Sequence, residues 1–112
     1  MKKIFISSPL RGDIEGNIQK VKKYCADVIR TKHLPIAPHL YFTQFLADNN
    51  KKERQLGIRG SLELLKLCDE LHVYTNTNGI ITEGMRREVR LAEKLGKKIV
   101  YRKIPFLTRR QK

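Results

Sequence analysis

One glutamate in this sequence stands where an apolar side chain is expected. Residues 82–96 (TEGMRREVRLAEKLG) have the composition of an α-helix. At about 100° per residue, such a helix places five small or apolar residues within roughly 60° of Glu88: Gly84, Met85, Leu91, Ala92 and Leu95. The charged residues then point to the other side: Glu83, Arg86, Arg87, Arg90, Glu93 and Lys94. A carboxylate at the centre of an apolar face must lose water, gain a partner or face a cleft. We therefore expect Glu88 to be recessed, with a raised pKa, either as a bonded structural group or as a reactive one.

Two further stretches are suited to binding an anion. Arg11 and Gly12 come just before a predicted helix, whose free N–H groups and dipole favour negative charge, and arginine adds a bidentate donor for phosphate. Thr82 and Gly84 begin the Glu88 helix and could offer a hydroxyl and a backbone N–H, although Thr82 could simply cap the helix. Neither stretch is a Walker or Gly-x-Gly-x-x-Gly motif, so the sequence gives no basis for ATP hydrolysis or hydride transfer.

The elements that would position these residues alternate between strand and helix. Short β-branched or aromatic runs predict four strands, at residues 3–7, 33–38, 69–74 and 98–101. Apolar residues at helical spacing predict three long helices, at about residues 14–30, 53–68 and 82–96. Residues 41–52 fit either a short helix or a packed loop, and would form a flap over a site. The alternation predicts an α/β fold, a Rossmann-like or flavodoxin-like three-layer sandwich with a parallel sheet of four or five strands in the order 2-1-3-4.

This topology predicts where a ligand binds. In parallel sheets ligands bind beyond the carboxyl ends of the strands at the switch point, here between the first and third strands. Three loops meet there, at residues 7–13, 38–41 and 75–84. Glu88, in the second turn of the helix that leaves the third loop, faces the same crevice. The convergence favours a functional role for Glu88 over a structural one.

Composition limits the class of protein. The 112 residues suit one domain, which we place at residues 1–102, followed by a basic tail at residues 103–112. The net charge of +13 favours anionic partners, but no helix-turn-helix, KH, zinc-finger or RNP pattern supports nucleic acid as the main one. No apolar run is long enough for a membrane span, and the short run Ile4–Ile6 makes no signal peptide, so we expect a cytoplasmic protein. Cys25 and Cys68 fit reduced packing residues.

Three motifs of the sequence occur together: Ile4–Gly12 (IFISSPLRG), Thr82-x-Gly84-x3-Glu88-x3-Ala92-x3-Gly96-Lys97, and Cys68-Asp69 before the third strand. With these motifs the sequence resembles the nucleoside 2-deoxyribosyltransferase superfamily. The similarity is greatest to its short bacterial and phage members and more distant to the 2'-deoxynucleoside 5'-phosphate N-hydrolases. It covers roughly residues 3–102.

The resemblance implies a reaction and a set of site residues. Glu88 would attack the anomeric carbon of a deoxyribosyl group, and water or a second base would resolve the covalent sugar-enzyme, as in retaining glycosidases. Thr82 and Gly84 would lie near the 5' hydroxyl or phosphate. His39 would touch the ligand, or serve only as a loop hydrogen-bonder. The loop after the first strand would hold sugar and base, through Ser7, Ser8, Pro9, Arg11 and Gly12. The resemblance implies no cofactor and no metal.

One departure from the family pattern divides the functional hypotheses. Catalytic relatives place an aspartate where this sequence has Ser61, and serine does not titrate near neutral pH. Asp69 could replace it only by reaching the crevice, and its position beside Cys68 favours a structural role. The first hypothesis is therefore an N-glycosidase or 2-deoxyribosyltransferase acting on a nucleoside or nucleoside monophosphate. The second is a non-catalytic protein that binds a nucleotide or nucleotide-derived signal, and the third a nucleic-acid-binding protein.

The small sheet also predicts self-association. Four strands leave the helix faces of the chain poorly covered, and relatives of this kind complete their pockets with a neighbouring subunit. We therefore expect a homodimer or a larger homo-oligomer, with Ile104, Phe106 and Leu107 of the tail contributing to the contact.

Overall fold

Four parallel strands form the centre of the structure, a computed structural model that describes residues 1–75 and 79–103. The strands are β1 (Lys3–Ser7), β2 (Leu34–Ile36), β3 (Glu70–Thr75) and β4 (Lys98–Lys103). Their order is β2-β1-β3-β4 and every neighbouring pair is parallel. The predicted fold class and strand order are confirmed, with four strands rather than five in the described ranges.

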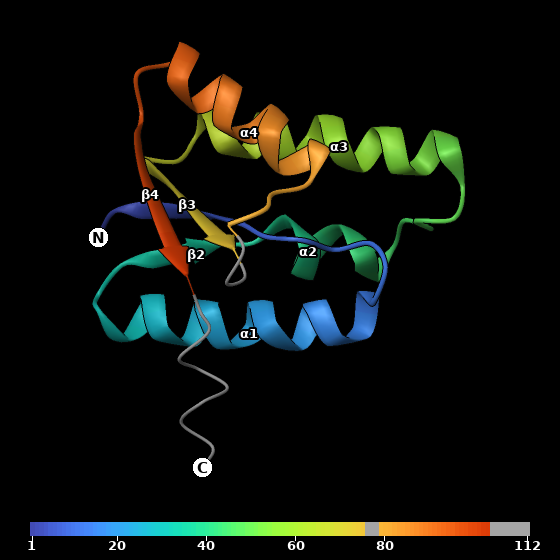
Figure 1. Ribbon diagram of the computed structural model, residues 1–112, viewed down its shortest axis with the longest axis horizontal. Helices are drawn as coiled ribbons and strands as arrows, with labels where there is room; N and C mark the ends of the chain where they lie inside the picture. The colour runs from blue at the N-terminus through green and yellow to red at the C-terminus, as the bar shows by residue number, and fades with distance from the viewer. Residues whose placement is uncertain (76–78, 104–112) are drawn as a thin grey trace.

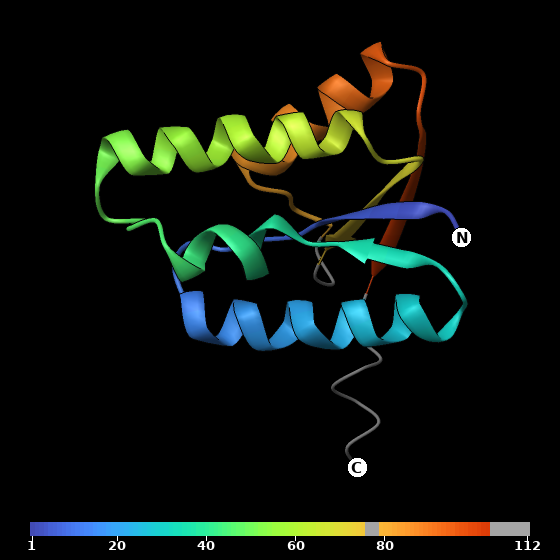
Figure 2. The same ribbon diagram turned by 180° about the vertical axis from the view of Figure 1, so that it is seen from behind.

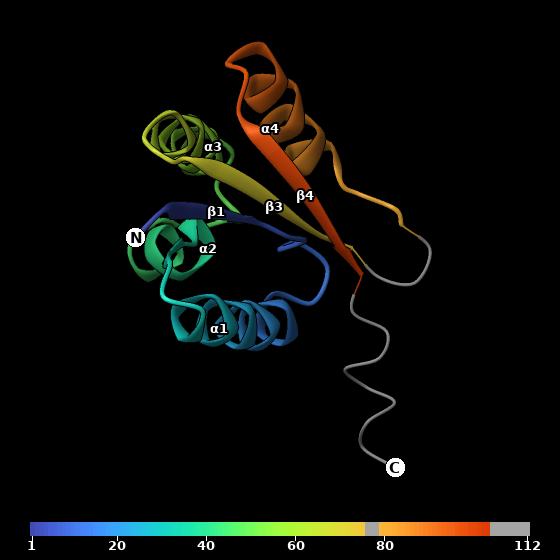
Figure 3. The same ribbon diagram turned by 90° about the vertical axis from the view of Figure 1, so that its left-hand side faces the viewer.

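Helices cover both faces of this sheet. Helix α1 (Ile14–Arg30) lies on one face, and α3 (Lys51–Lys66) and α4 (Glu83–Lys94) lie on the other, as the end-on view in Figure 3 shows. The short helix α2 (Pro38–Tyr41) and the 3₁₀ turn η1 (Phe42–Gln44) lead from β2 towards α3. The ambiguous stretch at residues 41–52 is thus helical at its start. Each long helix begins at a side chain that accepts a backbone N–H: Asp13, Asn50 and Thr82.

The alternation of side chains along β1 and β3 builds two cores. Phe5, Leu71 and Val73 pack under α3 and α4, where all three are fully buried. On the other face, the ring of Tyr74 stacks on that of Tyr24 from α1, with 4.1 Å between the ring centroids. Because a fully buried side chain of this size contributes about 1.5–3 kcal/mol, these two cores hold the helices on the sheet.

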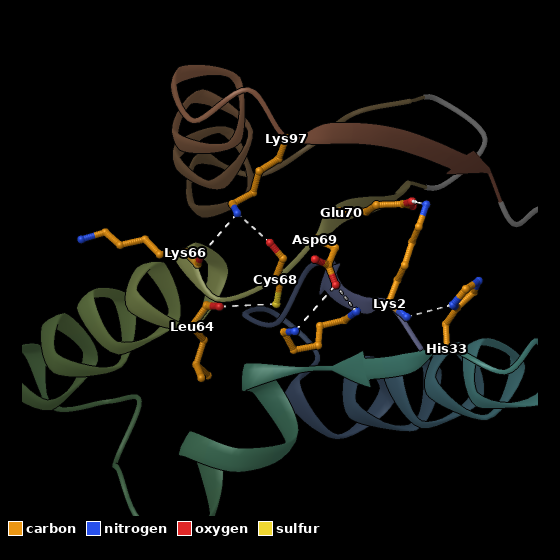
Figure 4. A network of polar contacts seen from close by, with 9 residues as sticks. Lys2, His33, Leu64, Lys66, Cys68, Asp69, Glu70 and Lys97 are labelled. Carbon is orange, nitrogen blue, oxygen red and sulfur yellow. Dashed lines mark hydrogen bonds and ion pairs between the residues drawn. The ribbon is translucent and has the colours of Figure 1, made fainter.

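Polar contacts join the amino ends of the strands, at the opposite end of the sheet from the β1–α1 loop (Figure 4). The carboxylate of Asp69 accepts the backbone N–H of Lys3 at 2.7 Å. The ammonium group of Lys97 donates to the carbonyl oxygens of Cys68 at 2.6 Å and Lys66 at 3.2 Å, which closes the end of α3. Asp69 therefore has a structural role and does not reach the crevice.

Element boundaries differ from the predictions by at most two residues. The second of the three predicted helices, α3, begins at Lys51 and ends at Lys66, so Cys68 follows it. The second strand is shorter than predicted because Pro38 begins α2, where a missing N–H costs no hydrogen bond. That strand lies at the sheet edge, as its prolines predicted. Cys25 and Cys68 are free thiols.

Several predictions concern parts of the chain or properties that the structure does not test. Ile104, Phe106 and Leu107 lie outside the described residues, so the tail, the domain boundary and the homo-oligomer stay predictions. No described helix has the length and hydropathy that a membrane crossing requires.

Candidate functional site

A cleft of about 390 Å³ opens at the carboxyl ends of β1 and β3. It is lined by the β1–α1 loop, by α2, by the first half of α3 with the loop before it, and by the start of α4. Figures 1 and 2 show these segments gathered at one end of the sheet. Residues of all three predicted loops line this cleft, among them Ser8, His39 and Thr82.

Glu88 lies in this cleft with a single hydrogen-bond partner among the described residues. The hydroxyl of Ser7, at the end of β1, donates to Oε1 of Glu88 at 2.6 Å. Burial raises the pKa of Glu88 to about 7, and the hydrogen bond from Ser7 acts in the opposite direction. The predicted recessed carboxylate with a raised pKa is confirmed. Near neutral pH both its ionised and protonated forms are therefore populated.

The orientation of α4 differs from the prediction. Its buried face is formed by Met85, Val89 and Ala92, which are 1%, 8% and 0% exposed. The centre of that face is about 60° around the helix from Glu88, so the prediction that Glu88 is at the centre was wrong. This rotation buries Val89 and leaves the carboxylate at the border of the cleft, where it keeps part of its hydration. Arg87, predicted to point outward, also lines the cleft.

Ser8, the residue that follows β1, is hydrogen-bonded to His39 of α2. Ser8 is 4% exposed, and its hydroxyl has no hydrogen-bond partner among the described residues. Its carbonyl oxygen lies 2.9 Å from Nε2 of His39. Because a carbonyl oxygen only accepts, Nε2 must carry the hydrogen, which leaves the lone pair of a neutral imidazole on Nδ1. Loss of hydration lowers the pKa of His39, so the neutral form is favoured.

Three arginines from three different elements line the cleft. Nε of Arg11 lies 3.2 Å from the carboxylate of Asp48, and the guanidinium of Arg54 donates to the backbone carbonyl of Asp48 at 3.0 Å. Arg87 is the third. Sequence reasoning found only Arg11 because it searched for anion sites at helix N-termini. Arg54, in the first turns of a helix that begins at the carboxyl end of the sheet, carried the same signal.

The other predicted site residues have mainly local roles. The hydroxyl of Thr82 accepts the N–H of Met85 at 3.2 Å, so it caps α4 while also lining the cleft. Gly84 lines the cleft as well, and an added Cβ there would meet no atom closer than 3.9 Å. Pro9 and Gly12 do not line the cleft, but the φ of +99° at Gly12 permits the turn that presents Arg11.

A smaller apolar recess of about 90 Å³ adjoins the cleft. Phe42 and Leu46 from the predicted flap close the recess. The residues that line both spaces are Leu10, His39, Asp48, Arg54 and Ile58. Ser61 lines neither space. Within residues 1–75 and 79–103, no group of three or more His, Cys, Asp or Glu residues is arranged to hold a metal ion.

Comparisons with known proteins agree with this fold. A family model described as "Domain of unknown function (DUF7768)" matches residues 2–102. No curated protein matches the sequence. The 2-deoxyribosyltransferase of the psychrotolerant bacterium Bacillus psychrosaccharolyticus superposes with a TM-score of 0.70 at 21% identity. The match covers 91% of this chain and 72% of the chain of that enzyme. The 2-deoxyribosyltransferase of Leishmania mexicana superposes with a TM-score of 0.64 at 18% identity. This match covers 92% of this chain and 65% of the chain of that enzyme, which is less than two thirds of its length. At these identities the similarity shows the fold, and the resemblance predicted from sequence is confirmed at that level.

Proposed function

The chain belongs to the family of DUF7768 domains, and we propose that its cleft binds a nucleoside or nucleoside monophosphate whose N-glycosidic bond Glu88 cleaves or exchanges. The observation that carries the proposal is Glu88 itself, a recessed carboxylate with a pKa of about 7, bonded only to Ser7 among the described residues. A recessed carboxylate with a perturbed pKa in a cleft is typical of functional sites.

The proposed reaction is the one that the family resemblance implies for a carboxylate at this position. The ionised Oε of Glu88 attacks the anomeric carbon, and the base leaves with the electrons of the C–N bond. Water or a second base then displaces Glu88 from the glycosyl-enzyme, so the configuration at the anomeric carbon is retained. The hydroxyl of Ser7 holds the attacking carboxylate in one orientation.

The surroundings of Glu88 support a nucleotide as the ligand. The apolar recess beside the cleft suits the faces of a base, with Phe42 and Ile58 in its walls. Arg11, Arg54 and the N-terminus of α4 suit a phosphate. The buried hydroxyl of Ser8 has no partner among the described residues, and buried polar groups are normally hydrogen-bonded, so a polar ligand group fits there. A phosphate at Arg11 would compete with Asp48.

A second candidate function is ligand binding without turnover. The position of Ser61 favours it, because the resemblance implied a proton donor there and Ser61 lines neither the cleft nor the recess. Binding of nucleic acid stays a prediction that rests on the net charge of +13.

A panel of 2'-deoxynucleosides and their 5'-monophosphates, assayed by chromatography for released base, tests the proposal. Glu88→Gln should abolish release while it preserves binding, because the amide keeps the shape but is not an anionic nucleophile. Glu93→Gln, on the exposed side of the same helix, is the matched control. Arg11→Ala should weaken binding of monophosphates more than that of nucleosides. If the wild type releases no base yet a panel member raises its melting temperature, the binding-only function replaces the enzymatic one.

A further inference from the structure

We propose that His39 is the acid and base of this cleft, in the role that the family resemblance assigns to an aspartate at the position of Ser61. The inference rests on the proposed function and adds to it the group that moves the proton. Its starting point is the last residue of β1, Ser7, together with the residue that follows the strand, Ser8. Ser7 donates to Glu88 at 2.6 Å, and the carbonyl of the next residue, Ser8, accepts from His39 at 2.9 Å. The side chains of Glu88 and His39 are thus hydrogen-bonded to consecutive residues, and both side chains line the cleft.

The hydrogen bond to Ser8 decides which nitrogen of His39 can react. Nε2 donates to the carbonyl and is engaged in every protonation state of the ring. None of the described residues forms a hydrogen bond with Nδ1. His39 also lines both the cleft and the apolar recess, so it lies at the junction of the proposed sugar and base positions. Nδ1 is therefore the atom available to a leaving base or to water.

The other acidic groups of the cleft are engaged by arginines. The carboxylate of Asp48 lies 3.2 Å from Nε of Arg11, so its oxygens are already paired with a cation. Glu83 accepts from Arg90 at 3.2 Å, and this contact holds the pKa of Glu83 below its usual value. Among the described residues that line the cleft, this leaves His39 as the titratable partner of Glu88.

Both steps of the reaction then balance. In the first, Glu88 bonds to the anomeric carbon, the C–N bond breaks with its electron pair going to the base, and the imidazolium of His39 gives that base its Nδ1 proton. In the second, a water oxygen bonds to the anomeric carbon and the bond to Glu88 breaks, returning the electron pair to the carboxylate. The proton of that water goes to Nδ1 of His39, so the imidazolium is regenerated.

The charges around His39 determine the expected pH dependence. Asp48 and Arg11 face it from two loops, and Glu53 and Arg54 of α3 line the same recess. Loss of hydration lowers the pKa of His39 against the opposing effect of Asp48, while the pKa of Glu88 is about 7. The reactive state needs one proton on this pair, placed on His39. Base release by the wild type should therefore peak below about pH 7 and fall above it.

The variant His39→Gln separates the proton donor from the nucleophile. The amide nitrogen of glutamine can still donate to the carbonyl of Ser8, but it supplies no proton to a base. We expect its release of guanine from 2'-deoxyguanosine 5'-monophosphate to fall at least about 100-fold, since general acids contribute about 10²–10⁴-fold. The remaining rate of guanine release should rise with pH through about pH 7 and then stay level, because it depends only on the ionisation of Glu88. His33→Gln, at the far end of the sheet, is the matched control and should behave as the wild type.

A substrate that needs no proton provides the decisive comparison. The 7-methyl derivative of the same nucleotide carries a positive charge on its base, which leaves as a neutral molecule without protonation. First-turnover release from this substrate should change no more than a few-fold in His39→Gln. His39→Asn, which also retains an amide donor, gives a second measurement if the first variant does not fold.

Each other outcome identifies a specific error. An equal loss on both substrates would make His39 a binding or structural residue and overturn the inference. The same would follow if Asp48→Asn, rather than His39→Gln, showed the selective loss on the unmethylated substrate. A wild type that releases base from neither nucleotide and from no other member of the panel would refute the proposed function itself. Full activity of His39→Gln on both nucleotides would refute only the role of His39.

Discussion

The raised pKa of Glu88 predicts a pH-dependent difference in stability that requires no knowledge of a substrate. The folded state holds a proton on this carboxyl up to about pH 7, against an ordinary value of 4.5. Between these values the folded state binds more protons than the unfolded state, so the free energy of unfolding falls as the pH rises. A shift from 4.5 to about 7 is about 2.5 units, which at 1.36 kcal/mol per unit sets an upper limit of about 3 kcal/mol. Because Glu88 is only partly buried, we expect its ionisation to lower the free energy of unfolding by about 1–3 kcal/mol.

Glu88→Gln removes this titration and keeps an oxygen that accepts from Ser7. We expect urea unfolding between pH 4.5 and 8.5 to show that the free energy of unfolding of the variant, relative to that of the wild type, increases as the pH rises. This difference should become constant well above about pH 7. Titrations of other residues, including His39, occur in both proteins and cancel in the difference. Glu93 is exposed on the same helix, so the free energy of unfolding of Glu93→Gln should differ from that of the wild type by the same amount at every pH. A constant difference for Glu88→Gln as well would refute the argument that burial raises the pKa of Glu88.

Two other predictions concern residues that contact the site or its wall. Ser7→Ala removes the hydrogen bond that stabilises the ionised form of Glu88, so the pKa of Glu88 should rise further above about 7, measurable by carbon NMR of its carboxyl group. Gly60→Ala should lower the free energy of unfolding by about 1–3 kcal/mol relative to Gly57→Ala. The reason is that a Cβ at Gly60 would lie 2.5 Å from the ring of Phe42, whereas one at Gly57 would be 3.5 Å from its nearest neighbour. Equal unfolding free energies for the two variants in urea would contradict the packing of Phe42 on α3.

The elements and the location of the cleft were predictable from sequence because each depends on local patterns. Alternating strands and helices imply a parallel sheet, and the carboxyl ends of its inner strands imply the position of Ser8, His39 and Thr82. The rotation of α4 was not predictable, because Val89 and Glu88 compete for the buried face and only packing against the sheet decides between them. The pairing of Arg11 with Asp48 depends on the path of the loop before α3, for which the sequence carries no periodic signal.

The pKa values of carboxyl groups are shifted in opposite directions at the two ends of the sheet, and this contrast supports the proposed role of Glu88. At the amino end, hydrogen bonds from His72 and Lys2 lower the pKa of Glu70 to about 2, so this ionised group stabilises the fold above about pH 4.5 and loses that effect as the pH falls towards 2. At the carboxyl end, burial raises the pKa of Glu88 to about 7, so its ionisation destabilises the fold at neutral pH. A leucine in place of Glu88 would avoid that destabilisation, and selection for stability alone therefore gives no reason to keep a glutamate there. The buried hydroxyl of Ser8, which has no partner among the described residues, carries a similar cost at the same end of the sheet. These two unfavourable groups lie in or beside one cleft, which supports the proposal that this end of the sheet serves binding and chemistry.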